Sequence, residues 1–229
     1  MIPSTFTRTF ILFTGMSVAL VGLYFSCLWG TASIANYLAQ NNLQMWVNGE
    51  SVPNREKWLK IQETMTFALD MEPNNADFQS DMGNLYLYKA NYLAIDTVQI
   101  DLLMQESLKH FRKAALLRPA WPDAWANIVF IKSKKNILDQ EFYHAFDRSV
   151  MLGSAVPRIQ YLLSVAAFSH WEMLPDSYKK KAMSNAYNAL SSRRKSDVLV
   201  SLRHYDLLSL ICERPSVPII VKPYCNNNS

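Results

Sequence analysis

Glycine is scarce in this chain. Only six of its 229 residues are glycine. They form neither G-x-G-x-x-G nor G-x-x-x-x-G-K, the patterns whose backbone amides cradle phosphate groups. So few glycines also argue against a β fold with many tight turns, since such turns depend on the positive φ angles that glycine adopts readily. The sequence therefore excludes the common phosphate-binding loops and a turn-dense β protein.

An excess of charge of one sign is also lacking. The chain has 23 Lys and Arg against 19 Asp and Glu, a net charge of +4. Nucleic-acid-binding domains carry a much stronger basic excess, so we expect no nucleic-acid partner. Two short basic runs, at 179–181 and 193–195, are typical of solvent-exposed helix faces. Contact with an anionic glycan or a lipid headgroup is the alternative interpretation of these runs.

Motifs for catalysis or metal binding are missing as well. The four histidines form no H-E-x-x-H, and the chain has no G-x-S-x-G. Glu141, His144 and Asp147 are spaced three residues apart and could share a helix face. Glu-x-x-His indicates a di-iron site only when it recurs in a bundle, and here it occurs once. We therefore predict a protein that is not an enzyme, with no catalytic residue, no metal and no cofactor.

Cysteine is limited to three positions. Cys27 lies within an apolar run, where a free cysteine behaves as a small hydrophobic residue. Cys212 and Cys225 lie close together near the C-terminus. If the domain is exported to an oxidising compartment, these two form the one candidate disulfide.

Charged side chains are absent altogether from residues 10–29. An uncharged run of this length matches the ~20 residues that a helix needs to cross the hydrocarbon core of a membrane. Arg8 precedes the run and the next charged residue is Glu50, a distribution that favours an N-terminus inside the cytoplasm and the rest outside. We predict a short cytoplasmic N-terminus over 1–9 and a retained transmembrane helix over 10–29.

Two alternatives for the N-terminal segment remain open. A cleavable signal peptide could end at the small residues of "TASIA", and a lipoprotein signal could end at Cys27. Beyond the apolar run, residues 30–54 stay nearly uncharged and show an apolar stripe opposite Asn and Gln side chains. We interpret them as a juxtamembrane helix and a linker.

From residue 55 onwards the pattern is helical, and prolines mark the corners. Proline has no N–H to donate inside a helix, but it fits the first helical position. In "RPAWPDAW" one helix therefore ends before Pro119 and the next begins at Pro122. A similar corner occurs at Pro73, and an alanine lies five residues before each closing proline, at Ala68 and Ala114. This regularity indicates an internal repeat.

The repeat resembles the tetratricopeptide pattern of paired helices. Ser107, Phe111 and Ala114 match its small, aromatic and alanine positions. Trp125 matches the position of a large side chain packed between helices, and we predict it to be structural. A third unit, which ends near Ser154, fits more loosely. We predict an all-α protein with a tetratricopeptide-like domain over 55–212 and an extended tail over 213–229. A generic helical bundle is the alternative.

The order of these segments resembles VpsP-type proteins, which are associated with bacterial exopolysaccharide biosynthesis. The similarity extends from about residue 10 to 212 and is most specific at "RPAWPDAWAN", whereas 154–156 depart from it. It implies a scaffold or adaptor in the bacterial inner membrane, with the helical domain in the periplasm. Its partners would be proteins of the polysaccharide assembly machinery. A module that binds the polysaccharide directly is the alternative.

In tetratricopeptide proteins the first helix of each pair lines a concave face. Carried onto the pairs that open at Ala76, Pro122 and Pro157, this rule predicts a partner-binding groove. We expect it to contain Asn84, Tyr88, Phe130, Lys134, Arg158 and Tyr161.

Overall fold

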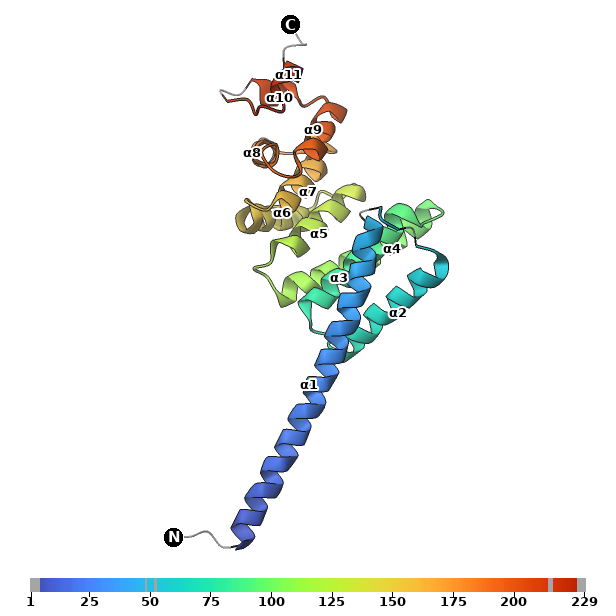
Figure 1. Cartoon of the computed structure of the whole chain (residues 1–229). Helices are drawn as coiled ribbons and strands as arrows, with labels where there is room; N and C mark the ends of the chain where they lie inside the picture. Colours follow the sequence, from blue (N-terminus) through green and yellow to red (C-terminus); the bar gives the residue numbers. More distant parts are fainter. Residues whose placement is uncertain (1–4, 48, 52, 214–215, 226–229) are drawn as a thin grey trace.

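The computed structural model describes residues 5–47, 49–51, 53–213 and 216–225, and within them it contains helices and no strand. The first helix, α1 (Thr5–Val47), is continuous over 43 residues. Its N-terminal half projects alone, while its C-terminal half lies among the other helices (Figure 1). These features confirm the predicted all-α fold with a long apolar N-terminal helix.

The helices beyond α1 stack largely in chain order toward the C-terminus (Figure 1). Three consecutive pairs form the centre of this stack, and the short connections make the two helices of each pair antiparallel neighbours. The elements are α2 (Arg55–Met71), α3 (Ala76–Tyr92), α4 (Thr97–Leu117), α5 (Pro122–Lys134), α6 (Gln140–Gly153), α7 (Pro157–Phe168), η1 (Trp171–Met173), α8 (Asp176–Ala189), α9 (Lys195–His204), α10 (Ser209–Cys212) and α11 (Lys222–Cys225). The pairs are α3 with α4, α5 with α6, and α7 with α8.

The corners form where the prolines predict them. Helix α4 ends at Leu117, and α5 begins with Pro122 in its first turn. At the preceding corner, the Asn75 side chain accepts hydrogen bonds from the first amides of α3 and caps the helix. The Arg118 guanidinium donates to both carboxylate oxygens of Asp77, at 2.9 and 3.0 Å. This ion pair joins the two corners to each other.

The contact between α3 and α4 depends on small side chains. The Ser107 hydroxyl donates to the carbonyl oxygen of Gly83 at 2.7 Å. A Cβ at Gly83 would lie 3.0 Å from the Phe111 ring, closer than side chains normally tolerate. Phe111 and Ala114 are fully buried. The small and aromatic positions therefore work as the repeat pattern predicts, since the helices approach closely and the ring fills the space beside them.

Trp125 differs from the expectation that it packs deep between helices. Its side chain is half-buried, and its indole N–H donates to the carbonyl oxygen of Pro119 at 2.9 Å. The His144 ring lies 5.4 Å away, centroid to centroid. The fully buried positions beside it are the alanines Ala124 and Ala126. Trp125 therefore packs beside α6 at the corner between α4 and α5, partly buried against the core.

The second half of α1 belongs to the packed domain. Ala32, Asn36, Ala39, Leu43 and Trp46 are buried, and their spacing of three or four residues places them on one helix face. This face packs against α2 and α3. We predicted residues 30–54 as a separate juxtamembrane helix and linker. The structure instead pairs this part of α1 with α2, because an apolar stripe of that width needs a partner.

The C-terminal segment folds back onto the stack, whereas we predicted an extended tail over 213–229. Val221 is fully buried in a cluster with Leu202 and Ile211. A disulfide joins Cys212 to Cys225, whose Cα atoms lie 5.5 Å apart. Residues 214–215 and 226–229 of the predicted tail lie outside the described part. The rest of the tail packs over apolar side chains at the end of the α7–α8 pair, which would otherwise be exposed to water.

Candidate binding groove

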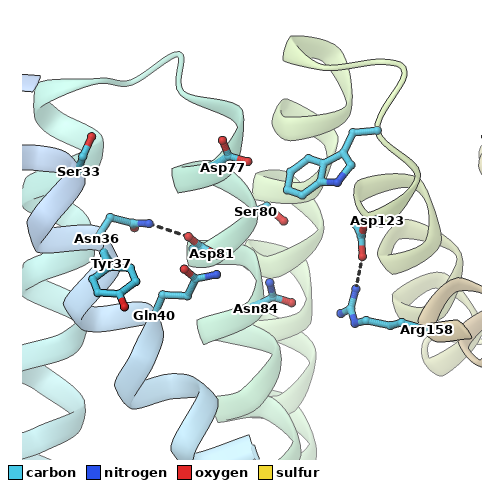
Figure 2. Close-up of a pocket in the computed structure, with 11 residues that line it drawn as sticks. Ser33, Asn36, Tyr37, Gln40, Asp77, Ser80, Asp81, Asn84, Asp123 and Arg158 are labelled. Atoms are coloured by element: carbon cyan, nitrogen blue, oxygen red, sulfur yellow. Dashed lines mark hydrogen bonds and ion pairs between the residues drawn. The ribbon is translucent and has the colours of Figure 1, made fainter. Parts of the chain in front are cut away.

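The first helices of successive pairs surround an elongated hollow. One section of about 430 Å³ is lined by α1, α3, the start of α5 and Arg158 of α7. A second section of about 330 Å³ continues along α1 and α3 toward Arg194. The two sections share Gln40, Asp81, Asn84 and Arg158, and we refer to them together as the groove. Figure 2 shows the first section, with labelled side chains of α1 and α3 on one side and Asp123 and Arg158 on the other.

The lining of the groove is polar and carries little net charge. Its wall on α1 presents side-chain amides and a tyrosine, and its wall on α3 presents further amides and two tyrosines. Each amide offers both a hydrogen-bond donor and an acceptor. The amide and tyrosine side chains of the two walls are Asn36, Tyr37, Gln40, Gln44, Asn84, Tyr88, Asn91 and Tyr92. Trp121 adds an indole ring.

The charged side chains at the edge of the groove neutralise one another. The Arg158 guanidinium donates to Asp123 at 2.7 Å and, through its other nitrogen, to the Asn127 side chain at 3.3 Å. Asp77 is paired with Arg118 at the neighbouring corner. A ligand that enters here therefore meets mainly dipoles, because the net charges are already compensated.

Asp81 is the exception, since its carboxylate is buried on the floor of the groove. The Asn36 side-chain amide of α1 donates a hydrogen bond to it at 2.6 Å (Figure 2). The pKa of Asp81 is raised to about 6, chiefly because burial penalises the charged form; the Asn36 hydrogen bond lowers the pKa and the nearby Asp77 charge raises it, both by less than burial does. The carbonyl oxygen of the Asn36 amide is buried and has no hydrogen-bond partner. This contact ties α1 to α3 and leaves one acceptor unsatisfied.

Comparisons with known proteins identify the fold and leave the family open. No known protein family and no curated protein matches the chain. Among solved structures, a thermophilic TPR protein from Thermus thermophilus matches with a TM-score of 0.57. The match covers 85% of this chain and 96% of that one, at 14% sequence identity. The chain has a tetratricopeptide-like fold. These comparisons give no support to the VpsP-type family.

Within this tetratricopeptide-like fold, the six residues predicted for the groove separate into two sets. Asn84, Tyr88 and Arg158 line the groove. Phe130, Lys134 and Tyr161 lie outside its two sections. The Lys134 amine sits 5.5 Å from the centroid of the Phe130 ring, which packs against the core. Tyr161 packs between the two largest apolar clusters, and the Arg194 guanidinium lies 5.6 Å from its ring.

The wall on α1 was not expected from the sequence. Ser33, Asn36, Tyr37 and Gln40 line the groove, although we assigned them to a juxtamembrane helix. A signal for them exists in the sequence, because Asn and Gln side chains alternate with the apolar stripe of residues 30–47 at helical spacing. The groove is therefore lined by the first helices of four pairs, α1, α3, α5 and α7, whereas we predicted only the last three of these helices.

The other polar residues singled out in the sequence have structural partners. Glu141 accepts hydrogen bonds from Arg112 at 2.7 and 2.6 Å and from the buried Lys132 at 2.6 Å. Asp147 accepts from Tyr178 and Lys181. No group of three His, Cys, Asp or Glu that could hold a metal ion occurs in the described part of the chain. In the second basic run, Arg194 pairs with Asp197 at 3.0 Å.

Proposed function

We propose that the chain is a membrane-anchored scaffold whose groove binds an extended segment of a partner protein. The position of the groove carries this proposal. The groove begins at Ser33, about one helical turn after Trp29, where the predicted transmembrane helix ends. Among the described residues, α1 is the one helix long and apolar enough to cross a membrane, and its apolar window has a mean hydropathy of 2.0 and no buried part. The groove would therefore open close to the membrane surface.

The chemistry of the lining supports a peptide ligand. An extended peptide presents backbone N–H and C=O groups at regular intervals, and the amides along α1 and α3 can pair with both kinds of group. Tyr88 and Trp121 supply rigid aromatic area, which contributes strongly to binding at protein interfaces. Compensated charges at the edge favour a partner segment with few charged residues. We propose no catalytic role for these side chains.

The setting that we propose is exopolysaccharide biosynthesis at the bacterial inner membrane, with the helical domain in the periplasm. The resemblance of the "RPAWPDAWAN" region to VpsP-type proteins supports the process. The position of Arg8 before the uncharged run supports the orientation. A disulfide between Cys212 and Cys225 is compatible with an oxidising compartment. The partners would then be proteins of the polysaccharide assembly machinery.

Direct binding of the polysaccharide is a second candidate function, and a specific part of the groove favours it. Tyr37 and Trp121 line the same section as Asp81 and Asn84. Aromatic rings stack on the apolar faces of sugars, while carboxylate and amide oxygens accept hydrogen bonds from hydroxyl groups. The low net charge of the lining suits a neutral polymer.

The test compares two double variants of the full chain in its native membrane. Tyr37→Ala with Asn84→Ala removes two groove side chains. Leu38→Ala with Asn41→Ala changes two exposed residues of α1 that do not line the groove. After detergent extraction, mass spectrometry quantifies the polysaccharide-assembly proteins that co-purify with each tagged chain. Circular dichroism checks that both variants stay helical.

We expect co-purification to fall strongly in the groove variant and to stay unchanged in the control. Equal recovery with both variants would contradict the scaffold proposal. Binding of the purified cellular exopolysaccharide, measured with the same two variants, distinguishes the second candidate. Loss of polymer binding in the groove variant, without any loss of protein partners, would favour the polysaccharide-binding module.

A further inference from the structure

One face of α1 carries small side chains inside the stretch that we assign to the membrane. Consecutive members of this face are three or four residues apart, so they follow one line along the helix. The glycines among them are open, since a Cβ added at any of them would meet nothing within 4 Å. The alanine and serine are exposed as well. We call Gly15, Ala19, Gly22, Ser26 and Gly30 the small-residue stripe.

The small-residue stripe leads directly into the groove. Ser33, Tyr37, Gln40 and Gln44 follow Gly30 at the same spacing, and all four line the groove. Helix α1 is continuous across this junction, so the stripe and the groove wall keep a fixed register (Figure 1). The α1 residues that pack against α2 and α3 lie on a different face. A single surface thus extends from the membrane-spanning part into the groove.

The groove itself contains an unsatisfied polar group. Asn36 is 4% exposed and lines the groove, and its amide nitrogen donates to Asp81. Its carbonyl oxygen has no partner. A buried acceptor without a hydrogen bond is costly and rare in folded proteins. This oxygen is closed off from the groove, so a donor on a ligand would satisfy it only by displacing the side chains that cover it, close to the place where the small-residue stripe ends.

We infer that the partner is an integral membrane protein. One of its transmembrane helices packs along the small-residue stripe, and the segment that follows this helix enters the groove. In lipid, close packing of backbones drives helix association, and small side chains allow it. A soluble partner would use the groove and leave the stripe uncovered. This inference rests on the proposed function, because it names the class of partner that the groove binds.

Photo-crosslinking in native membranes tests the inference with the full-length chain. The photoreactive amino acid p-benzoylphenylalanine replaces Ser26 in the stripe or Tyr37 in the groove, one position at a time. Ser17 and Tyr24, on the opposite side of α1, serve as matched controls within the membrane segment. We expect the Ser26 and Tyr37 probes to label the same polypeptide, and that polypeptide to stay in the membrane after an alkaline carbonate wash. The control probes should label it about tenfold more weakly.

A second variant tests whether the small size of the stripe matters. Gly22→Leu should weaken the Ser26 crosslink by about tenfold, because a leucine keeps the two helix backbones apart. Val21→Leu, one position away on another face, should leave it unchanged. A groove crosslink to a protein that carbonate extracts would overturn this inference and leave the proposed function intact. Crosslinks to a second copy of the chain would also overturn it. No crosslink at either position would contradict both proposals.

Discussion

Asp81 and Asn36 form a polar contact between α3 and α1, two helices whose other buried contacts are mainly apolar. Asp81 is 8% exposed, and the Asn36 side-chain amide donates a hydrogen bond to its carboxylate at 2.6 Å. Water is largely excluded, so the ionised carboxylate is poorly solvated and the pKa rises to about 6. A well-packed apolar pair could join α1 to α3 without this cost. The presence of the polar pair on the floor of the groove therefore fits a role in ligand contact.

Asp81→Asn should stabilise the protein at neutral pH and change its stability little in acid. The folded-state pKa of about 6 lies above the ordinary value of 3.8 for an aspartate, so the folded state favours the protonated acid. The contribution of the protonated Asp81 carboxyl to the free energy of unfolding is complete below pH 3.8 and is lost as the pH rises through 6. The shift corresponds to about 3 kcal/mol at most, at about 1.4 kcal/mol for each pKa unit. The melting temperatures of variant and parent are compared at pH 4 and pH 7.5.

The matched control for this prediction is Asp70→Asn, which changes an exposed aspartate of α2. It should give a small difference at both pH values. Asparagine has nearly the same shape as aspartate but no charge, so it removes the cost of a buried charge only at pH values at which Asp81 is ionised. Equal stabilisation by Asp81→Asn at pH 4 and pH 7.5 would therefore contradict the raised pKa.

At the scale of elements, the C-terminal helices act as a cap. The last pair of a helical repeat exposes an apolar face, because no further pair covers it. Here α9, α10 and α11 cover that face, with Val198, Leu202 and Val221 fully buried. The short helices α10 and α11 have few internal hydrogen bonds of their own. They depend on burial and on the Cys212–Cys225 disulfide.

We predict that Cys212 and Cys225 are oxidised in the mature protein and that the bridge stabilises the cap. The chain-entropy estimate for a loop of this length is about 3 kcal/mol. Cys225→Ser should therefore lower the melting temperature, while Cys27→Ser, in the exposed apolar half of α1, should not. Non-reducing mass spectrometry measures the bridge directly. Two free thiols in exported material would count against both the bridge and the oxidising compartment.

At the scale of the whole molecule, α1 fixes the orientation of the helical domain relative to the projecting N-terminal half of the same helix. Its exposed half and its packed half form one continuous helix, so the domain cannot reorient freely about a linker. Trp29 lines a hollow of about 500 Å³ together with the corner at 71–77, Leu117 and Arg118. Tryptophan favours the boundary between lipid and water. In our proposal this corner therefore lies at the membrane surface, with the groove beside it.

The orientation of the whole chain is tested by reporter fusions at Ser229. If α1 stays uncleaved and crosses the inner membrane with the N-terminus inside, alkaline phosphatase at this position should be active. A reporter that works only in the cytoplasm should be inactive there and active when joined after residue 9. A tag at Met1 should remain on the full-length protein. Activity at Ser229 from the cytoplasmic reporter alone would show the opposite orientation, and loss of the tag would show a cleaved signal.

Much of the fold was predictable because the signals are local. Proline lacks an N–H, so Pro119 and Pro122 mark a helix end and a helix start wherever the chain lies in space. The Ser107, Phe111 and Ala114 pattern specifies a close helix pair, and the structure builds that pair around Gly83. An uncharged run such as 10–29 likewise predicts a long apolar helix without knowledge of its neighbours.

The groove was predictable only in part, because exposure depends on which element covers a helix face. Asn84 and Tyr88 line the groove since α1 packs beside α3 and forms the opposite wall. Phe130 and Tyr161 were predicted by the same repeat rule, yet they are partly buried against the apolar clusters and lie outside the groove. The sequence by itself determined the helices, their corners and their close pairs. Only the tertiary structure decided that α1 joins the stack, because its apolar packing against α2 and α3 and the Asn36–Asp81 hydrogen bond form only in the folded chain.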